Sequence, residues 1–252
     1  MNVGLLLDML DTGHYVAGLA NDGDLLVFRP GSAPTLIEWC IQTFTGQPEI
    51  HAAQVFELTP ATRAAFAAVN IYFADDEDYC VCESTLDVEG LKIVDNGPTV
   101  TPLRARLVNE GHITALGHWR TLATPDQVAA MVGYWCGLIA GHTVYGVGQI
   151  LLLAAWKTAV SATRARLGWW GWVPWWGGQV KAQLEHLLAH PPVPLFNEQV
   201  CSTSAAASAV TGCMADLNRD GAWDSVDARL AYGVTPGDLL ALPEIAASRL
   251  QE

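Results

Sequence analysis

The chain carries a cysteine at a position where a thiol can become a nucleophile. Cys201 opens the stretch CSTSAAASAV, residues 201–210, whose small side chains predict a helix. The first N–H groups of a helix have no partner within it, and together with the helix dipole they favour a thiolate over a thiol. The same groups can stabilise an oxyanion on a substrate carbonyl. The sequence therefore predicts a nucleophile at Cys201, and a nucleophile of this kind needs a base.

The base must be one of seven histidines. His51 is the best placed, because it begins the alternating run HAAQVFEL directly after the loop TFTGQPEI, where side chains face the rim of a cleft rather than a core. His186 and His190 lie four residues apart on a predicted helix, but no Glu or Cys completes a zinc pattern with them. The other histidines stand beside glycine or in predicted loops: His14, His112, His118 and His142.

A strand-rich first half and a helix-rich second half must position these residues. Alternating runs bounded by turn residues predict strands at 24–28, 51–58, 70–74, 79–85, 90–94 and 113–119. Apolar residues at helical spacing predict helices at 124–139, 147–168 and 177–190. A strand-rich segment followed by a helix-rich segment indicates an α+β fold.

The order of the motifs resembles that of the NlpC-type papain-like cysteine peptidases. GDLLVF, a helical spacer and IHAAQVF together resemble the family's Gly-Asp strand followed by a strand that begins with histidine. The nucleophilic cysteine usually precedes this block, whereas here YCVCEST and then VCSTSAAASAV follow it. That order is similar to the circularly permuted branch, the YiiX-like proteins, which are related in fold to lecithin retinol acyltransferase. The resemblance covers residues 23–212, most of the chain.

The resemblance implies a permuted papain-like fold, in which an antiparallel sheet packs against a helical half that carries the nucleophile helix. It makes Cys201 the nucleophile, His51 the general base and Glu83 the group that orients the imidazole. Strand alternation places Glu83 on the face opposite Cys80 and Cys82, so that it can point at the histidine from a neighbouring strand. The resemblance also implies three residues near the substrate: Tyr145, Ser202 and Asp24. Asp24 stands at the family's Gly-Asp position, where a structural role fits better.

The implied activity is that of a thiol hydrolase that cleaves an amide in a peptide or in a stem peptide of peptidoglycan. Such a site requires no cofactor. Two alternatives stay open. The same triad can carry acyl transfer or hydrolysis of a lipid (thio)ester. Thr203 stands where the family usually has an acidic residue, which also fits a non-catalytic module that retained the fold, for example in a phage particle.

We expect the hydrolase domain to span residues 1–214 and a helical extension to span 215–252. In the extension, DLNRDGAWDSVD matches the spacing of an EF-hand or dockerin-type loop, in which oxygen ligands surround a calcium ion and Gly221 makes the sharp turn. An Asp/Asn-rich turn that caps a following helix explains the same residues. The predicted calcium ligands are Asp216, Asn218, Asp220, Asp224 and Asp227.

Composition limits the partners. The formal net charge is -13 and no Lys/Arg-rich stripe is present, so neither a nucleic acid nor an anionic membrane is an expected partner. The first residues contain no basic segment typical of a secretory signal, which favours a cytoplasmic location at synthesis, with incorporation into a virion as a route outside. Residues 131–156 carry no charge, and two buried helices divided near Gly141 explain this better than a membrane span.

The segment LGWWGWVPWW, residues 167–176, contains five of the ten tryptophans. Its Gly171 and Pro174 predict a loop between two helices. Trp combines a large apolar body with a polar N–H group, so this loop fits a groove wall, a partner surface or an anchor at a membrane interface. A loop folded over the core fits equally well.

Overall fold

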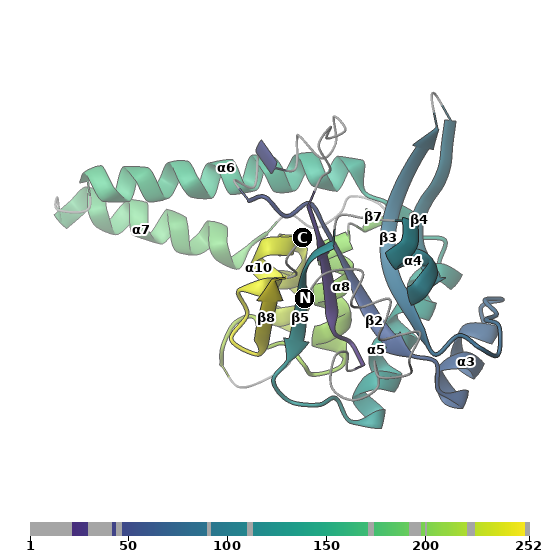
Figure 1. Cartoon of the computed structure of the whole chain (residues 1–252). Coiled ribbons are helices and arrows are strands. Elements are labelled where there is room, and N and C mark those ends of the chain that lie inside the picture. The colour runs from purple at the N-terminus through teal and green to yellow at the C-terminus, as the bar shows by residue number, and fades with distance from the viewer. Residues whose placement is uncertain are drawn as a thin grey trace.

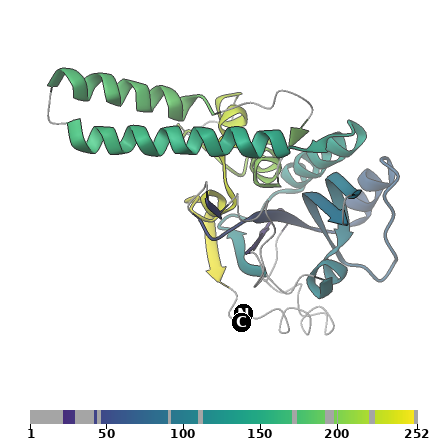
Figure 2. The ribbon, with the colours of Figure 1, turned by 90° about the horizontal axis from the view of Figure 1, so that it is seen from above.

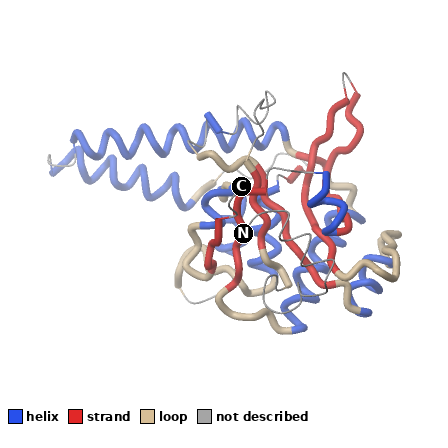
Figure 3. Tube along the Cα trace, in the orientation of Figure 1, coloured by secondary structure: helices blue, strands red, loops and turns tan. Residues whose placement is uncertain are grey.

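The computed structural model describes residues 22–29, 42–43, 47–89, 92–109, 113–170, 174–191, 198–199, 201–220 and 225–249. These residues form an α+β fold, as the sequence predicts, with helices and strands intermixed in one body and two long helices reaching out from it (Figure 3). No helix among these segments is long and apolar enough to cross a membrane.

A six-stranded antiparallel sheet forms the centre, in the order β4-β3-β2-β1-β5-β8. All four residues of β1 are buried, because strands flank it on both edges and apolar groups cover it. The long β3–β4 pair reaches beyond the body (Figure 1). The strands are β1 (Leu25–Phe28), β2 (His51–Glu57), β3 (Tyr79–Glu89), β4 (Lys92–Pro102), β5 (Ile113–Trp119) and β8 (Ile245–Arg249).

Helices α5 and α8 pack with the sheet to form the main core, which includes Phe56, Trp135 and Ala205. Nine of the eleven residues of α8 are buried, and its small side chains allow the helix to lie close to β2. The helices are α3 (Pro60–Ala67), α4 (Leu103–Asn109), α5 (Pro125–Ala140), α6 (Val147–Trp170), α7 (Pro174–Ala189), α8 (Cys201–Thr211), α9 (Ser225–Leu230) and α10 (Pro236–Leu240), with a 3-10 turn, η2, at Ala231–Gly233.

The uncharged segment 131–156 forms parts of two helices, α5 and α6, as predicted. The start of α5 also follows its sequence signal, because Thr124 and Gln127 cap each other's backbone N–H groups and Pro125 occupies the first turn. Helix α6 differs from the expectation. It does not lie within the core but pairs with α7 in a long hairpin that projects from the body (Figures 1 and 2).

Three other predictions differ from the structure. Residues 70–74, expected as a strand, form a turn and an irregular segment, because α3 ends here and Asn70 adopts a left-handed conformation. The predicted loop at 167–176 is mostly helical, since α6 continues to Trp170 and α7 begins at Pro174. Proline at the first position of a helix is favourable, so the same residue that suggests a loop can start α7. Strand β8 adds an edge to the sheet within the expected helical extension.

Candidate active site

Cys201 is the first residue of α8, as the sequence predicts for a nucleophile at a helix start. Its side chain is buried with 3% of the residue exposed, and its sulfur lies 4.0 Å from the Ile50 carbonyl oxygen. The backbone N–H groups of Ala52 and Ser202 donate to this sulfur. The thiol of α8 therefore meets the beginning of β2, where His51 stands.

The structure brings Cys201, His51 and Glu83 together. His51 Nε2 donates to Glu83 Oε2 over 2.6 Å, and the imidazole also hydrogen-bonds the Cys201 side chain. Because Nε2 is hydrogen-bonded to the Glu83 carboxylate, Nδ1 is the ring nitrogen that remains for the Cys201 thiol. The antiparallel pairing of β2 with β3 places both polar side chains on one face of the sheet, opposite the buried Cys80 and Cys82.

Arg106 is a further member of this cluster that sequence reasoning missed. Its Nε lies 2.6 Å from Glu83 Oε1, and its Nη2 donates to Oε2 over 2.8 Å, which makes a two-pronged ion pair. The guanidinium also stacks over the Phe28 ring at 4.6 Å, and the same ring lies 5.2 Å from the His51 ring. A detectable signal exists in LRARLVN, where leucines four residues apart mark a short amphipathic helix, α4, directly after β4.

Charge in this cluster is arranged as an ion pair between sulfur and imidazole. Burial alone raises the pKa of the Cys201 thiol, but the charge and hydrogen bond of His51 outweigh burial and lower it. Burial alone lowers the pKa of His51, yet the Cys201 thiolate and Glu83 raise it to about 10. Burial likewise raises the pKa of Glu83, and His51 with Arg106 holds it below its usual range. Thiolate, imidazolium and carboxylate thus favour one another.

Tyr145 contributes the next group at the thiol. Its side chain hydrogen-bonds the Cys201 side chain, and burial together with the nearby thiolate raises its pKa well above the usual range, so the hydroxyl keeps its proton. A short parallel pair, β6 (Val144–Tyr145) with β7 (Glu198–Gln199), joins Tyr145 to the segment that leads into α8. The backbone N–H of Tyr145 also donates to Asn96 Oδ1 over 2.8 Å.

Gly97 allows this approach of Tyr145. Its φ is +130°, and a Cβ built there would clash with the Thr143 carbonyl oxygen. Strand β4 can therefore lie directly against the segment that precedes Tyr145 only with glycine at this position.

Ser202 and Asp24, both predicted near the substrate, use their side chains for hydrogen bonds to backbone groups of the fold. The Ser202 hydroxyl donates to the Val234 carbonyl over 2.8 Å, and its contribution at the thiol is the backbone N–H. Asp24 is completely buried and accepts a hydrogen bond from the Trp119 backbone. Their side-chain hydrogen bonding gives no support to a substrate contact, because buried groups committed to backbone partners are costly to redirect.

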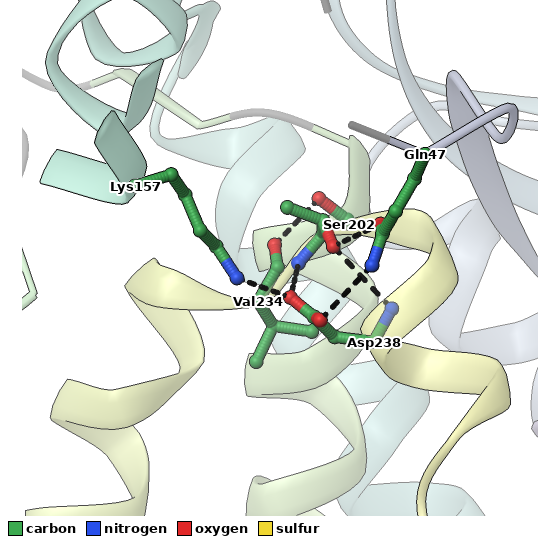
Figure 4. Close-up of polar contacts among 6 residues, drawn as sticks. Gln47, Lys157, Ser202, Val234 and Asp238 are labelled. Atoms are coloured by element: carbon green, nitrogen blue, oxygen red, sulfur yellow. Dashed lines mark hydrogen bonds and ion pairs between the residues drawn. The ribbon is translucent and has the colours of Figure 1, made fainter. Parts of the chain in front are cut away.

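A polar cluster connects the surroundings of the thiol to the hairpin (Figure 4). Lys157 of α6 lies 2.6 Å from Asp238 of α10, and Gln47 donates to the same carboxylate over 3.2 Å. Gln47 also accepts from Thr235, and Ser202 reaches the neighbouring Val234. The cluster thus joins the middle of α6 to the segment before β2 and to the start of α8.

The remaining described cysteines differ from Cys201. Cys82 is fully buried, and burial together with Cys80 raises its pKa well above the usual range, which keeps it a thiol. Burial also raises the pKa of Cys136. Cys213 is exposed, just after α8. In contrast to Cys82 and Cys136, Cys201 has a pKa below its usual range.

The other histidines lie apart from this cluster or outside the described residues. His142 stands in the exposed turn after α5, and His118 belongs to β5. His186 and His190 are exposed on and just after α7, with their rings 4.3 Å apart. His14 and His112 fall outside the described residues.

The predicted calcium loop is described in part, since Asp224 lies outside the described residues. Asp216 accepts from the Arg219 N–H, and Asp227, completely buried, accepts from two backbone N–H groups of the loop. Within the described ranges, no group of three or more His, Cys, Asp or Glu side chains could hold a metal ion. Asn218 and Asp220 are also joined, because the Asn218 side chain donates to Asp220 Oδ2 over 3.2 Å and accepts from the Asp220 N–H over 3.0 Å.

Compared with protein-family models, with curated proteins and with solved structures, the chain matches none of them.

Proposed function

We propose that the chain is a cysteine hydrolase of permuted papain-like architecture that cleaves an amide bond in a peptide or in a stem peptide of peptidoglycan. The observation that carries the proposal is the hydrogen-bonded series from Cys201 through His51 to Glu83. A thiol at a helix start, paired with an imidazole that a buried carboxylate orients, is the arrangement that nucleophilic acyl transfer needs. The order of these residues along the chain supports the permuted form.

In the proposed reaction the Cys201 thiolate attacks the substrate carbonyl carbon. A C–S bond forms, and one electron pair of the carbonyl moves onto its oxygen. The Tyr145 hydroxyl, which keeps its proton beside the sulfur, is positioned to donate to that oxyanion. His51 then gives its proton to the leaving amine as the C–N bond breaks. Water attacks the resulting thioester with neutral His51 as base, and an acid is released while the thiolate returns.

The test measures labelling and turnover in the same variants. Cys201→Ala and His51→Ala should each abolish release of amines from peptidoglycan fragments or peptides, while far-ultraviolet circular dichroism stays unchanged. Iodoacetamide at pH 6 to 7 should modify Cys201 in the intact protein, located by peptide mass spectrometry. Cys213→Ser is the matched control, since it removes an exposed thiol remote from the triad and should leave both readouts intact.

Two other outcomes identify the alternatives. Transfer of an acyl group to an added amine or alcohol acceptor, with thioester substrates preferred over amides, indicates acyl transfer or lipid (thio)ester hydrolysis on the same triad. A Cys201 that resists iodoacetamide at neutral pH in a folded protein indicates a non-catalytic module, for example of a phage particle. That second outcome contradicts the proposed function.

A further inference from the structure

Residues 234–238 connect two parts of the chain that meet at the triad. They lead from the 3-10 turn η2 into α10, and we refer to them as the C-terminal clamp. Ser202 of α8 donates to the Val234 carbonyl over 2.8 Å (Figure 4). The Thr235 hydroxyl donates to Gln47, in the segment before β2, over 2.6 Å. One short segment thus holds both the start of α8 and the segment that leads into β2.

The clamp binds Gln47 at both ends of its side-chain amide. Besides the bond that its Oε1 accepts from Thr235, its Nε2 donates to Asp238 Oδ1 over 3.2 Å. Gly237 allows this close approach, since a Cβ built there would lie 2.5 Å from Gln47 Oε1. Thr235 and Asp238 also cap each other's backbone N–H groups at the start of α10, which fixes both partners of the amide. The clamp therefore sets the position of Gln47.

Asp238 is the charged member of the clamp. Burial raises the pKa of its carboxyl, but Lys157 and Thr235 outweigh burial and hold this pKa below its usual range. Lys157 Nζ lies 2.6 Å from Asp238 Oδ2, and the Thr235 N–H donates to the same oxygen over 2.9 Å. The ionised carboxylate thus accepts from the hairpin, from the start of α10 and from Gln47.

The two attachments of the clamp lie next to the reacting groups. Gln47 stands four residues before His51, and within this short stretch the Ile50 carbonyl oxygen lies 4.0 Å from the Cys201 sulfur. On the other side, Ser202 follows Cys201 directly. Movement at the clamp would therefore change the separation of the sulfur from the imidazole.

We propose that the C-terminal clamp aligns the Cys201 thiol with the His51 imidazole. Gln47 and Asp238 are then positioning residues, which act through the backbone on either side of the triad and not on the substrate. Acyl transfer depends on such alignment, because a displacement of about 1 Å can lower a rate about a hundredfold. The inference rests on the proposed function. It gives the segment 215–252, expected as an extension of the hydrolase domain, a part in the machinery of the triad.

Gln47→Met tests the clamp, since methionine keeps the length of the side chain and makes neither hydrogen bond. The kcat on a peptide substrate should fall about tenfold to a hundredfold, with KM within about twofold, because the reacting groups are displaced and the substrate contacts are not. The pH midpoint for alkylation of Cys201 by iodoacetamide, followed by peptide mass spectrometry, should rise. A more distant imidazolium stabilises the thiolate less.

Gln127→Met is the matched control. Gln127 is half-buried, as Gln47 is, and its side chain also makes one hydrogen bond as acceptor and one as donor, to the Thr124 N–H and the Cys213 carbonyl. These contacts lie beyond the end of α8 that is opposite to Cys201. The melting temperature should fall about as much as in Gln47→Met, whereas kcat and the alkylation midpoint should stay those of the parent.

Gly237→Ala supplies a second variant, because it leaves every hydrogen-bonding side chain in place and adds a Cβ against the Gln47 amide. It should lower kcat and raise the midpoint, and it decides alone if Gln47→Met does not fold. Unchanged kcat and midpoint in the folded variants, or an equal loss of kcat in Gln127→Met, would overturn the proposal. If the parent hydrolyses no substrate, the proposed function fails, and the alkylation midpoint alone decides whether the clamp aligns the pair.

Discussion

Substituting Glu83 by glutamine should lower the pKa of His51. The side chain keeps its size and one hydrogen-bond acceptor, but the negative charge that lies 2.6 Å from Nε2 is lost. A hydrogen bond to a charged group contributes about 1.5–3 kcal/mol, and one pKa unit corresponds to about 1.4 kcal/mol. The pKa of His51, about 10 in the parent, should therefore fall by about one to two units in Glu83→Gln.

The measurement is an NMR titration of the His51 ring, with the pH dependence of Cys201 alkylation as a second readout. A less stable imidazolium stabilises the Cys201 thiolate less. The pH midpoint for alkylation of Cys201 should therefore rise in Glu83→Gln. An unchanged His51 pKa in a folded Glu83→Gln protein would refute the role that the geometry gives to this carboxylate.

Arg106→Gln is the matched control for this experiment. It breaks the same ion pair from the other side, so both variants should lose a similar part of the free energy of unfolding, about 3–5 kcal/mol for a buried pair with one partner removed. In Arg106→Gln the Glu83 carboxylate keeps its charge, and the arginine that competes with His51 for this carboxylate is absent. The pKa of His51 should then stay high or rise, opposite in direction to Glu83→Gln, although both proteins are destabilised. A fall in both variants would show that the effect comes from loosened packing and not from charge.

Three further predictions concern the thiol, its neighbours and the C-terminal loop. The rate should rise with pH as the Cys201 thiol ionises below its usual range, and fall above about 10 as His51 loses the proton that the leaving amine needs, which a pH–rate profile records as two apparent pKa values of the pair. Gly97→Ala should lower kcat with a smaller effect on the melting temperature, because a Cβ pushes the Thr143 carbonyl and displaces Tyr145; unchanged kcat would argue against a positioning role. Asp227→Ala should cost about 1–3 kcal/mol in urea unfolding, because two half-buried backbone N–H groups lose their acceptor, and a melting temperature that rises with calcium in the parent but not in this variant would support the predicted metal site.

The local parts of the site could be predicted from the sequence because each carries a short-range signal. A run of small residues after Cys201 indicates a closely packed helix, and alternation along YCVCEST places Glu83 opposite two buried cysteines. His51 followed from its place at the start of a strand. These signals depend on residues near one another in the chain, where backbone geometry alone decides which side chains share a face.

Long-range contacts left no such signal. Arg106 contacts Glu83 from α4, a helix that does not adjoin β3 in the sequence. The pairing of β8 with β5 joins residues more than 120 positions apart. The Trp-rich segment was expected to be a loop because Gly171 and Pro174 suggest a break, but Pro174 begins a helix instead. Helix propensity along the sequence does not determine whether two long helices, here α6 and α7, pair with each other or pack within the core.

The order of the strands has a consequence for how the chain folds as it is synthesised. β1 occupies the middle of the sheet between β2 and β5, whereas α8 and β8 come late in the sequence, and 151 positions separate Ile50 from Cys201. Closing so long a loop is slow, so we expect the sheet to assemble first and the thiol to meet its imidazole as one of the last events. A nascent chain would then carry a dormant cysteine until most of its length has emerged. In refolding experiments, rapid alkylation of Cys201 at neutral pH should appear after the bulk of the secondary structure, and simultaneous recovery of both signals would contradict this order.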